Sequence, residues 1–403
     1  MKFNEQPIVN SFLDTDLYKL TMMQAVVHFF PDVYVENSFY CRNKNIDLTR
    51  HIDEIKKEIL ELKDLEFRLN ELNFLRTIPF LKEDFIQFLE NFKFNIDDIE
   101  IKIIDGKLSI KTKGLWWQTI LYEIYILSIV NEIYFRNLTK NMSKREKYDL
   151  FEEGRRRLGL KIEKIKDRKG FKFTEMGTRR RFSREWQMEI VHYLSHEAKE
   201  HLQGTSNLYL ANEYKLKPMG TMAHEFLQAF QSLSDNIIDS QKDAMKYWIK
   251  EYNDNLGVVL TDVITLDDFL LDFNKEFAEA FDGVRQDSGD PFIWAEKMIA
   301  HYKKLGIDPK TKKLVFSDSL NFDKAIELYD RFHDQALVSF GIGTNLTNDL
   351  GPEPLDIVMK MTKCNGKDVA KISDTAIKAD LFNQTYVKEL KKIFLKKREA
   401  YLA

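Results

Sequence analysis

One stretch organises this chain: Pro218-Met219-Gly220-Thr221-Met222-Ala223-His224-Glu225, followed by the apolar run Phe226, Leu227, Ala229 and Phe230. The pattern predicts a glycine turn and then a histidine at the start of an amphipathic helix. Gly220 lets the backbone approach a ligand closely, and free N–H groups at a helix start attract an anion. A neutral imidazole there is a nucleophile that can accept a phosphoryl group. The structural alternative is a histidine hydrogen-bonded beneath a helix, so the neighbouring motifs decide.

Short strand patterns that end in glycine or polar loops surround this stretch. Strands are expected at residues 171–173, 216–220, 257–260, 283–285, 314–316 and 338–340, each followed by a polar loop and a helix. Repeated units of this kind predict a parallel, barrel-like α/β domain. In such domains the active site lies at the carboxyl ends of the strands, where these polar residues fall.

The first third of the chain mixes helices and strands without strict alternation. Helices are expected at residues 14–30, 48–72, 83–92 and 116–135, a strand at 33–41 and a hairpin at 99–112. We therefore predict an α+β N-terminal domain over residues 1–125 and an irregular (β/α) barrel-like catalytic domain over 126–362. Residues 363–403 are expected to form a hairpin and a helix that pack back on the N-terminal domain.

Composition excludes several classes of protein. The 403 residues are 44% hydrophobic and 31% charged with a net charge of −3, which is typical of a globular protein and favours neither nucleic acid nor an anionic membrane. Cys41 and Cys364 are too few for a disulfide framework, which indicates a cytoplasmic protein. The apolar run at residues 115–130 is interrupted by polar residues and falls short of the roughly 20 residues of a membrane span. The basic run at 140–169 is interpreted as a solvated helix face.

Two further motifs are suited to bind phosphate groups. Gly341-Ile342-Gly343-Thr344 after a strand would present backbone N–H groups and a hydroxyl to a phosphate, although such a sequence alone is more often a tight turn. Arg179, Arg180 and Arg181 form a cationic cluster that suits a pyrophosphate, or else an inter-domain or inter-subunit salt bridge. Neither a P-loop nor a dinucleotide-binding glycine motif occurs in the chain.

The segment Arg285-Gln286-Asp287-Ser288-Gly289-Asp290 gathers opposite charges at one strand end. Arg285 can grip a substrate carboxylate through two parallel hydrogen bonds. The Asp287 and Asp290 carboxylates are suited to stabilise positive charge on a sugar, or to hold magnesium through water. An Asx turn with a surface ion pair is the structural alternative.

Three histidines leave a different class of function open. His192 and His196 are four residues apart, a spacing compatible with zinc, and His201 follows. No glutamate directly follows the first of them as in HExxH metalloproteases. A barrel metal-dependent hydrolase is therefore the alternative from another class, and stoichiometric zinc in the purified protein would support it.

Taken together, the motifs resemble the nicotinate phosphoribosyltransferase family in its bacterial form. The resemblance runs in order through nearly the whole chain: 14–19 (DTDLYK), 175–181 (EMGTRRR), 204–207 (GTSN), 220–225 (GTMAHE), 260–262 (LTD), 285–290 (RQDSGD), 316–320 (FSDSL) and 341–347 (GIGTNLT). Each piece alone is a weak signal, but the combination is specific.

The resemblance implies a reaction. Nicotinate and phosphoribosyl pyrophosphate would condense to nicotinate mononucleotide and pyrophosphate in NAD biosynthesis, coupled to hydrolysis of ATP to ADP and phosphate. His224 would match the histidine that ATP transiently phosphorylates. Magnesium would be bound by the substrates, and no metal ligand is directly assigned. A nicotinamide or quinolinate phosphoribosyltransferase of the same fold is the nearest alternative.

The resemblance also implies roles for single residues. Tyr18 would stack on the pyridine ring, and Thr221 and Arg285 would bind nicotinate, with Arg285 taking its carboxylate. The phosphoribosyl and pyrophosphate groups would contact a further set: Arg179, Arg181, Ser288, Gly341, Gly343 and Thr344. Family members are usually homodimers with shared active sites, so Tyr18 and Phe39 are expected to reach across to a partner subunit.

Overall fold

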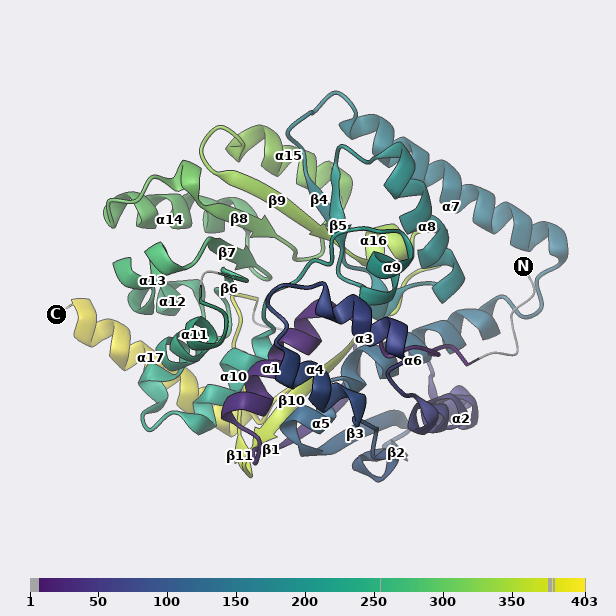
Figure 1. Ribbon diagram of the computed structural model, residues 1–403, viewed down its shortest axis with the longest axis horizontal. Helices are drawn as coiled ribbons and strands as arrows, with labels where there is room; N and C mark the ends of the chain where they lie inside the picture. Colours follow the sequence, from purple (N-terminus) through teal and green to yellow (C-terminus); the bar gives the residue numbers. More distant parts are fainter. Residues whose placement is uncertain (1–6, 254, 376–378, 380, 403) are drawn as a thin grey trace.

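The computed structural model describes residues 7–253, 255–375, 379 and 381–402. It contains two sheets with helices around and between them (Figure 1). One is antiparallel and built from both ends of the chain, and the other is parallel and built from the middle. No helix among the described residues is both long and apolar enough to cross a membrane.

The antiparallel sheet has five strands in the order β11-β10-β1-β3-β2. Its strands are β1 (Tyr34–Cys41), β2 (Ile99–Ile104), β3 (Lys107–Leu115), β10 (Ile357–Cys364) and β11 (Lys367–Asp368). The expected hairpin joins β2 to β3, and its turn residues Asp105 and Gly106 both have positive φ, as tight hairpin turns require. Strand β10 pairs along the length of β1, so the carboxyl-terminal part of the chain completes the amino-terminal sheet.

Helices of the first third pack around this sheet. They are α1 (Leu17–Phe29), α2 (Ile52–Leu60), α3 (Leu69–Arg76), α4 (Glu83–Glu90), α5 (Trp116–Thr119) and α6 (Tyr122–Leu138). Helix α1 is buried on nearly every side, including the polar Lys19 and Gln24, because it lies between the two sheets (Figure 1). This position carries Tyr18 at its first turn towards the parallel sheet.

The parallel sheet has six strands in the order β5-β4-β9-β8-β7-β6. They are β4 (Phe173–Glu175), β5 (Leu202–Thr205), β6 (Val258–Leu260), β7 (Gly283–Gln286), β8 (Lys313–Phe316) and β9 (Leu337–Ile342). Five of the six expected strands are present. The sixth, expected at 216–220, contributes a single bridge between Pro218 and Thr205, because proline cannot donate to a ladder. Strand β5 takes that place beside β4, and no ladder joins β5 to β6 among the described residues, so the barrel is irregular and incompletely closed.

Helices connect and cover these strands (Figure 1). Their bounds are α7 (Lys144–Ile165), α8 (Arg184–Glu197), α9 (Leu208–Glu213), α10 (His224–Leu233), α11 (Ser240–Tyr252), α12 (Leu266–Asp272), α13 (Lys275–Ala280), α14 (Pro291–Lys304), α15 (Phe322–Phe332) and α16 (Thr344–Thr347). Helix α7 carries the basic run, and many of its basic side chains pair with acidic ones, as Arg156 does with Glu153, which fits a solvated face. The α/β class predicted from the sequence is confirmed.

The last helix, α17 (Gln384–Leu402), takes a different place from the one expected. It lies against α12 and the short 3₁₀ helix Ile237–Asp239, both on the parallel-sheet side, rather than against the N-terminal domain. Lys397 reaches the buried carboxylate of Asp272 at 2.7 Å, and Arg398 pairs with Asp268 at 3.0 Å. These buried carboxylates need cationic partners, and α17 supplies them.

Candidate active site

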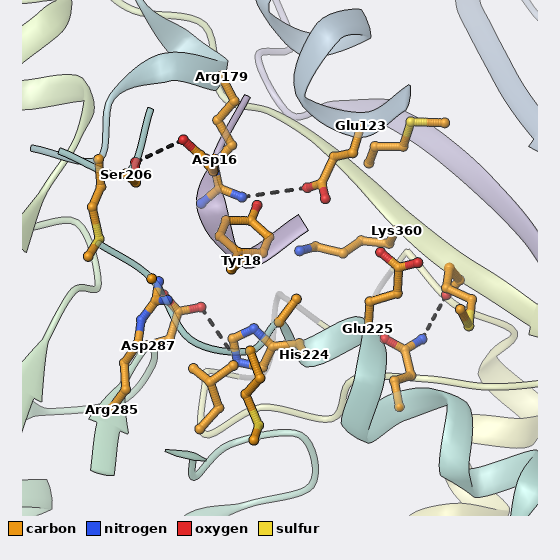
Figure 2. A pocket seen from close by; sticks show the side chains of 18 of the residues that line it. Asp16, Tyr18, Glu123, Arg179, Ser206, His224, Glu225, Arg285, Asp287 and Lys360 are labelled. Atoms are coloured by element: carbon orange, nitrogen blue, oxygen red, sulfur yellow. Dashed lines mark hydrogen bonds and ion pairs between the residues drawn. The ribbon is translucent and has the colours of Figure 1, made fainter. Parts of the chain in front are cut away.

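His224 begins helix α10 at the carboxyl ends of the parallel strands. The loop before it passes directly under helix α1, since a Cβ at Gly220 would lie 3.0 Å from the backbone nitrogen of Tyr18. Glycine at this position therefore brings the loop and the Tyr18 turn together. The resulting cavity is lined by Tyr18, His224 and Arg285, among other residues (Figure 2).

A buried network of opposite charges holds the imidazole of His224. Its Nε2 lies 2.6 Å from Oδ1 of Asp262 and 3.7 Å from Oδ2 of Asp287. The ammonium of Lys371 lies 2.8 Å from Asp262 and 3.2 Å from Asp287. Burial, together with the nearby charge of Lys371, outweighs the two carboxylates and lowers the pKa of His224 to about 4. The ring is therefore neutral at pH 7.

The hydrogen bond to Asp262 fixes how that neutral ring is protonated. A carboxylate only accepts, so Nε2 carries the hydrogen and Nδ1 keeps its lone pair. Ser288 donates to the other oxygen of Asp262 at 2.5 Å and thereby orients the carboxylate. The resemblance assigns Ser288 to the phosphoribosyl group. In the structure Ser288 is buried and contacts Asp262, which in turn contacts His224.

Arg285 and Asp287 extend from the end of β7 beside this network. The Nε of Arg285 donates to Ser317 Oγ at 2.8 Å, and its NH2 lies 3.8 Å from Asp287 Oδ1. Lys371 and Arg285 hold the pKa of Asp287 well below its usual range against the opposing effect of burial. Arg285 therefore lies beside an ionised carboxylate, with one edge of its guanidinium held in place by Ser317.

The opposite wall of the cavity carries a second group of charges around Tyr18 (Figure 2). Glu123 accepts from Lys19 at 2.5 Å and lies 3.6 Å from Arg179. These cations and Lys360 lower the pKa of Glu123 to about 2 although burial opposes the shift. For Lys360 burial dominates and lowers the pKa of its ammonium to about 8.

Tyr18 lines the cavity of its own chain. Its ring lies beside Lys360 and Arg179 and faces the same space as His224 (Figure 2). The expectation that Tyr18 also reaches into a partner subunit stays a prediction. Phe39, the other residue expected to cross, is buried in the core of its own chain on β1.

A second cavity of about 800 Å³ opens beside the first. Gly341, Gly343 and Thr344 line it, and their contact with a phosphate stays a prediction. Packing requires glycine at 343, since a Cβ there would lie 2.7 Å from the backbone oxygen of Met176, whereas a Cβ at Gly341 would lie 2.6 Å from the sulfur of the flexible Met176 side chain. Arginines and lysines from five segments also line this cavity: Arg42, Arg179, Arg180, Arg285, Lys360 and Lys371. Acidic residues line it as well: Asp287, Asp318, Asp349, Glu353 and Asp356.

Two residues predicted to act in the site, Arg181 and Asp290, do not line these cavities. Arg181 is buried and donates through both terminal nitrogens to Asp14, at 2.7 and 2.8 Å, so it ties the start of α1 to the parallel sheet. The guanidinium of Arg180 lines the 800 Å³ cavity in its place. Asp290 caps helix α14 by accepting from the backbone nitrogens of Phe292 and Ile293, which leaves it outside the cavities described here.

Thr221 does not line the cavity that holds Tyr18 and His224. It lines a cavity of about 1290 Å³ that meets the first one at Gly220, and its carbonyl oxygen accepts from Thr21 at 2.6 Å. Thr221 and Tyr18, both predicted to bind nicotinate, thus flank Gly220 from two cavities.

The histidines proposed for zinc do not converge. His192 and His196 are exposed on α8, while His201 is buried and bonds the carbonyl oxygen of Phe171 at 3.0 Å. Within the described part of the chain, the group with metal-ligand spacing is His224, Asp262 and Asp287. Lys371 is already paired with both carboxylates of that group, so it is poorly suited to a resident metal cation.

Several of these residues escaped the sequence analysis. Asp262 was visible in the 260–262 motif after a strand but had no role, and its position at a strand end was the available signal. Lys360 lies on β10 and Lys371 follows β11, so only the pairing of β10 with β1 brings them to the site. Glu123 belongs to helix α6, whose apolar sequence predicts only a buried helix.

A buried, neutral histidine and several arginine and lysine side chains line cavities at the carboxyl ends of a parallel sheet, an arrangement typical of an α/β enzyme for anionic substrates. The model of the nicotinate phosphoribosyltransferase (NAPRTase) family matches residues 171–398, and that of the NAPRTase N-terminal domain matches 13–131. The chain therefore belongs to the nicotinate phosphoribosyltransferase family.

Individual relatives agree along nearly their whole length. Nicotinate phosphoribosyltransferase of Xanthomonas axonopodis pv. citri is 46% identical over 391 residues, covering 96% of this chain and 98% of the relative. That of Bordetella pertussis is 47% identical over 400 residues, covering 98% and 96%. The crystal structure of nicotinate phosphoribosyltransferase from Vibrio cholerae superposes with a TM-score of 0.91 at 40% identity, covering 97% of this chain and 95% of that one.

Proposed function

We propose that this chain joins nicotinate to phosphoribosyl pyrophosphate, giving nicotinate mononucleotide and pyrophosphate, and couples the reaction to ATP hydrolysis through a transient phosphohistidine. Family membership supports the phosphoribosyl transfer. The observation that carries the ATP coupling is a neutral, oriented imidazole that lines the same cavity as Arg179, Arg285 and Lys360. The product is a precursor in NAD biosynthesis.

In the first step His224 accepts a phosphoryl group. Nδ1 holds the free lone pair because Nε2–H is donated to Asp262. It attacks the γ-phosphorus of ATP, the bond from that phosphorus to the bridging oxygen breaks, and ADP leaves with the electron pair. The low pKa of His224 means that no proton must first leave Nδ1, and Asp262 stabilises the positive charge that the ring gains.

In the second step the pyridine nitrogen attacks the anomeric carbon of the ribose. The carbon–oxygen bond to pyrophosphate breaks, and pyrophosphate departs with both electrons. Asp287 is placed to stabilise the positive charge on the sugar, and Arg285 to take the nicotinate carboxylate, with Tyr18 against the ring. Water then cleaves the phosphorus–nitrogen bond, releasing phosphate and restoring His224.

Magnesium enters this scheme with the substrates. When bound to pyrophosphate oxygens it neutralises the charge that builds up on the leaving group. Asp287 and Asp318 are among the carboxylates that line the 800 Å³ cavity, and a hydrated magnesium ion there would contact them through its water shell.

Phosphorylation is tested with ATP labelled at the γ-phosphate. The wild-type chain is expected to take up label that is stable in base and labile in acid. His224→Ala should lose the label together with the ATP stimulation of nicotinate mononucleotide formation. His192→Ala, on the exposed face of α8, is the matched control and should keep both. Label retained by His224→Ala would contradict the assignment.

The same preparation decides between pyridine substrates. Nicotinate, nicotinamide and quinolinate are offered at equal concentration with phosphoribosyl pyrophosphate, and we expect nicotinate mononucleotide to dominate. Preference for the amide would remove the carboxylate role of Arg285.

We further propose a cytoplasmic homodimer. Light scattering on the purified protein should then give twice the 47.7 kDa of one chain. A mass of one chain would exclude the dimer without affecting the site, because Tyr18 and His224 line one cavity within a single chain.

A further inference from the structure

The largest of the three cavities lies at the amino ends of the parallel strands, opposite the 800 Å³ cavity. Its volume is about 1290 Å³, and its lining includes Lys172 before β4, Gly257 before β6, Asp282 before β7 and Lys313 at the start of β8. Residues of helix α3 and of the loop that follows it, within 70–80, complete the wall. The proposed function gives this space no role.

A parallel barrel normally has no such space. Its interior is packed with layers of bulky branched side chains and forms a core. Here Val258, Val315 and Ser339 present short side chains to the cavity and remain only half-buried, although β8 and β9, which carry the last two, lie inside the sheet. An interior left open at a cost in packing energy indicates a use for the space.

Only a few shared residues separate this cavity from the active-site cavity. Met176, Met219, Gly220 and Arg285 line both the 1290 Å³ cavity and the cavity that holds Tyr18 and His224. Two of these four are methionines, whose unbranched side chains change rotamer easily. A ring bound between Tyr18 and Arg285 would therefore touch the wall that separates the two spaces.

The outer mouth is suited to an organic anion. Lys172, Lys215, Lys217 and Lys313 line it, and Asp282 is the acidic residue among them, paired with Lys313 at 3.1 Å. Phe74, Ile78, Pro79 and Phe80 supply an apolar wall on one side. A cationic rim over an apolar passage attracts and admits a small aromatic carboxylate.

We propose that this cavity is a second entrance to the active site, through which the pyridine carboxylate reaches Tyr18 and Arg285 while phosphoribosyl pyrophosphate fills the 800 Å³ cavity. The inference rests on the proposed function. It explains how a small ring arrives behind a bulky phosphorylated substrate that closes the other side.

An order-of-addition experiment tests the route. Ser339→Trp narrows the passage, and Ser339→Ala is its control, since it removes the hydrogen bond to Gln203 without filling space. Single-turnover formation of nicotinate mononucleotide is followed by rapid quench, with the enzyme preloaded either with nicotinate or with phosphoribosyl pyrophosphate and magnesium.

We expect wild type and Ser339→Ala to react at similar rates in both orders. Ser339→Trp should react normally when nicotinate is preloaded, and about tenfold or more slowly when phosphoribosyl pyrophosphate is preloaded. Equal rates in both orders for a folded Ser339→Trp would overturn the second entrance. Absence of product in every variant and order would instead reject the proposed function.

If Ser339→Trp fails to fold, a surface variant still tests the second entrance. Lys217→Glu changes the charge of an exposed side chain at the mouth, and Lys199→Glu makes the same change on an exposed residue just beyond α8. At low salt, Lys217→Glu should lower kcat/KM for nicotinate about threefold or more, with little change at high salt, while Lys199→Glu has no effect. Identical values for the two variants would overturn the proposal.

Discussion

Two groups of charges face each other across the active-site cavity, and they differ in how completely they are paired. Around His224, the ammonium of Lys371 is paired with the carboxylates of both Asp262 and Asp287 within 3.2 Å. Around Tyr18, Glu123 is shared between Lys19 and a more distant Arg179, and Lys360 extends into the cavity (Figure 2). The first group is organised before any substrate arrives, whereas the second has charge to offer to a substrate. The wall with His224 is thereby suited to the chemistry, and the wall with Tyr18 is suited to substrate binding.

The strongest test of this division removes the charge behind His224. Asp262→Asn keeps the shape of the side chain but can donate its amide hydrogen to Nε2, which favours the wrong tautomer. We expect the rate of histidine phosphorylation to fall about a thousandfold, as for carboxylates that orient catalytic histidines.

Quench-flow labelling with γ-labelled ATP measures that rate. Ser288→Ala loosens Asp262 without removing its charge and serves as the milder control. A rate within a few-fold of wild type for Asp262→Asn would show that the carboxylate does not set the tautomer.

The buried ion pair between Asp14 and Arg181 holds the start of α1 near Tyr18, and its contribution can be measured as a change in protein stability. Asp14→Ala leaves the buried guanidinium of Arg181 without its main partner, and such a loss costs about 3–5 kcal/mol in the free energy of unfolding. Urea unfolding measures the change. Asp330→Ala, which breaks an exposed pair with Arg168, should cost less than about 1 kcal/mol.

The binding wall should respond to pH through Lys360. Its pKa of about 8 lies below the usual 10.5, so the cation is present below pH 8 and is lost as pH rises through that value. Because Lys360 lines the 800 Å³ cavity, KM for phosphoribosyl pyrophosphate should rise several-fold between pH 7.5 and 9. Initial rates across this range provide the measurement, and Lys360→Met should show a higher KM that no longer changes with pH.

The smallest expected effect is a rate that stays constant. The pKa of His224 is lowered from 6.5 to about 4, so the acceptor remains neutral as pH falls from 8 to about 5. The initial rate of phosphorylation, quenched into base, should show no acid limb near pH 6.5. A midpoint at 6.5 would mean that the imidazole is solvated and lies outside the network described here.

Regular patterns made much of the fold predictable. Strands β6 to β9 each carry a short apolar run that ends in glycine or a polar loop, and all four are present. Strand β5 (Leu202–Thr205) was missed because its sequence, LQGT, has no apolar run of its own. The false strand at 216–220 has apolar residues but includes Pro218, and it forms a single bridge.

The site was less predictable, because two of its features depend on three-dimensional detail. Three adjacent arginines look equivalent in the sequence, but the 3₁₀ turn Thr178–Arg180 sends Arg179 and Arg180 to the cavities and leaves Arg181 facing Asp14. Lys371 reaches His224 from a segment nearly 150 positions further along the chain. No local pattern marks either arrangement.

The position of Tyr18 has a consequence for mixtures of working and damaged copies. A single chain supplies both the aromatic wall and the histidine of one cavity. If each cavity works with the residues of its own chain, a copy that lacks Tyr18 and a copy that lacks His224 should fail to rescue each other when mixed. Activity should then follow the number of intact chains, whereas rescue in the mixture would show that the subunits share their sites.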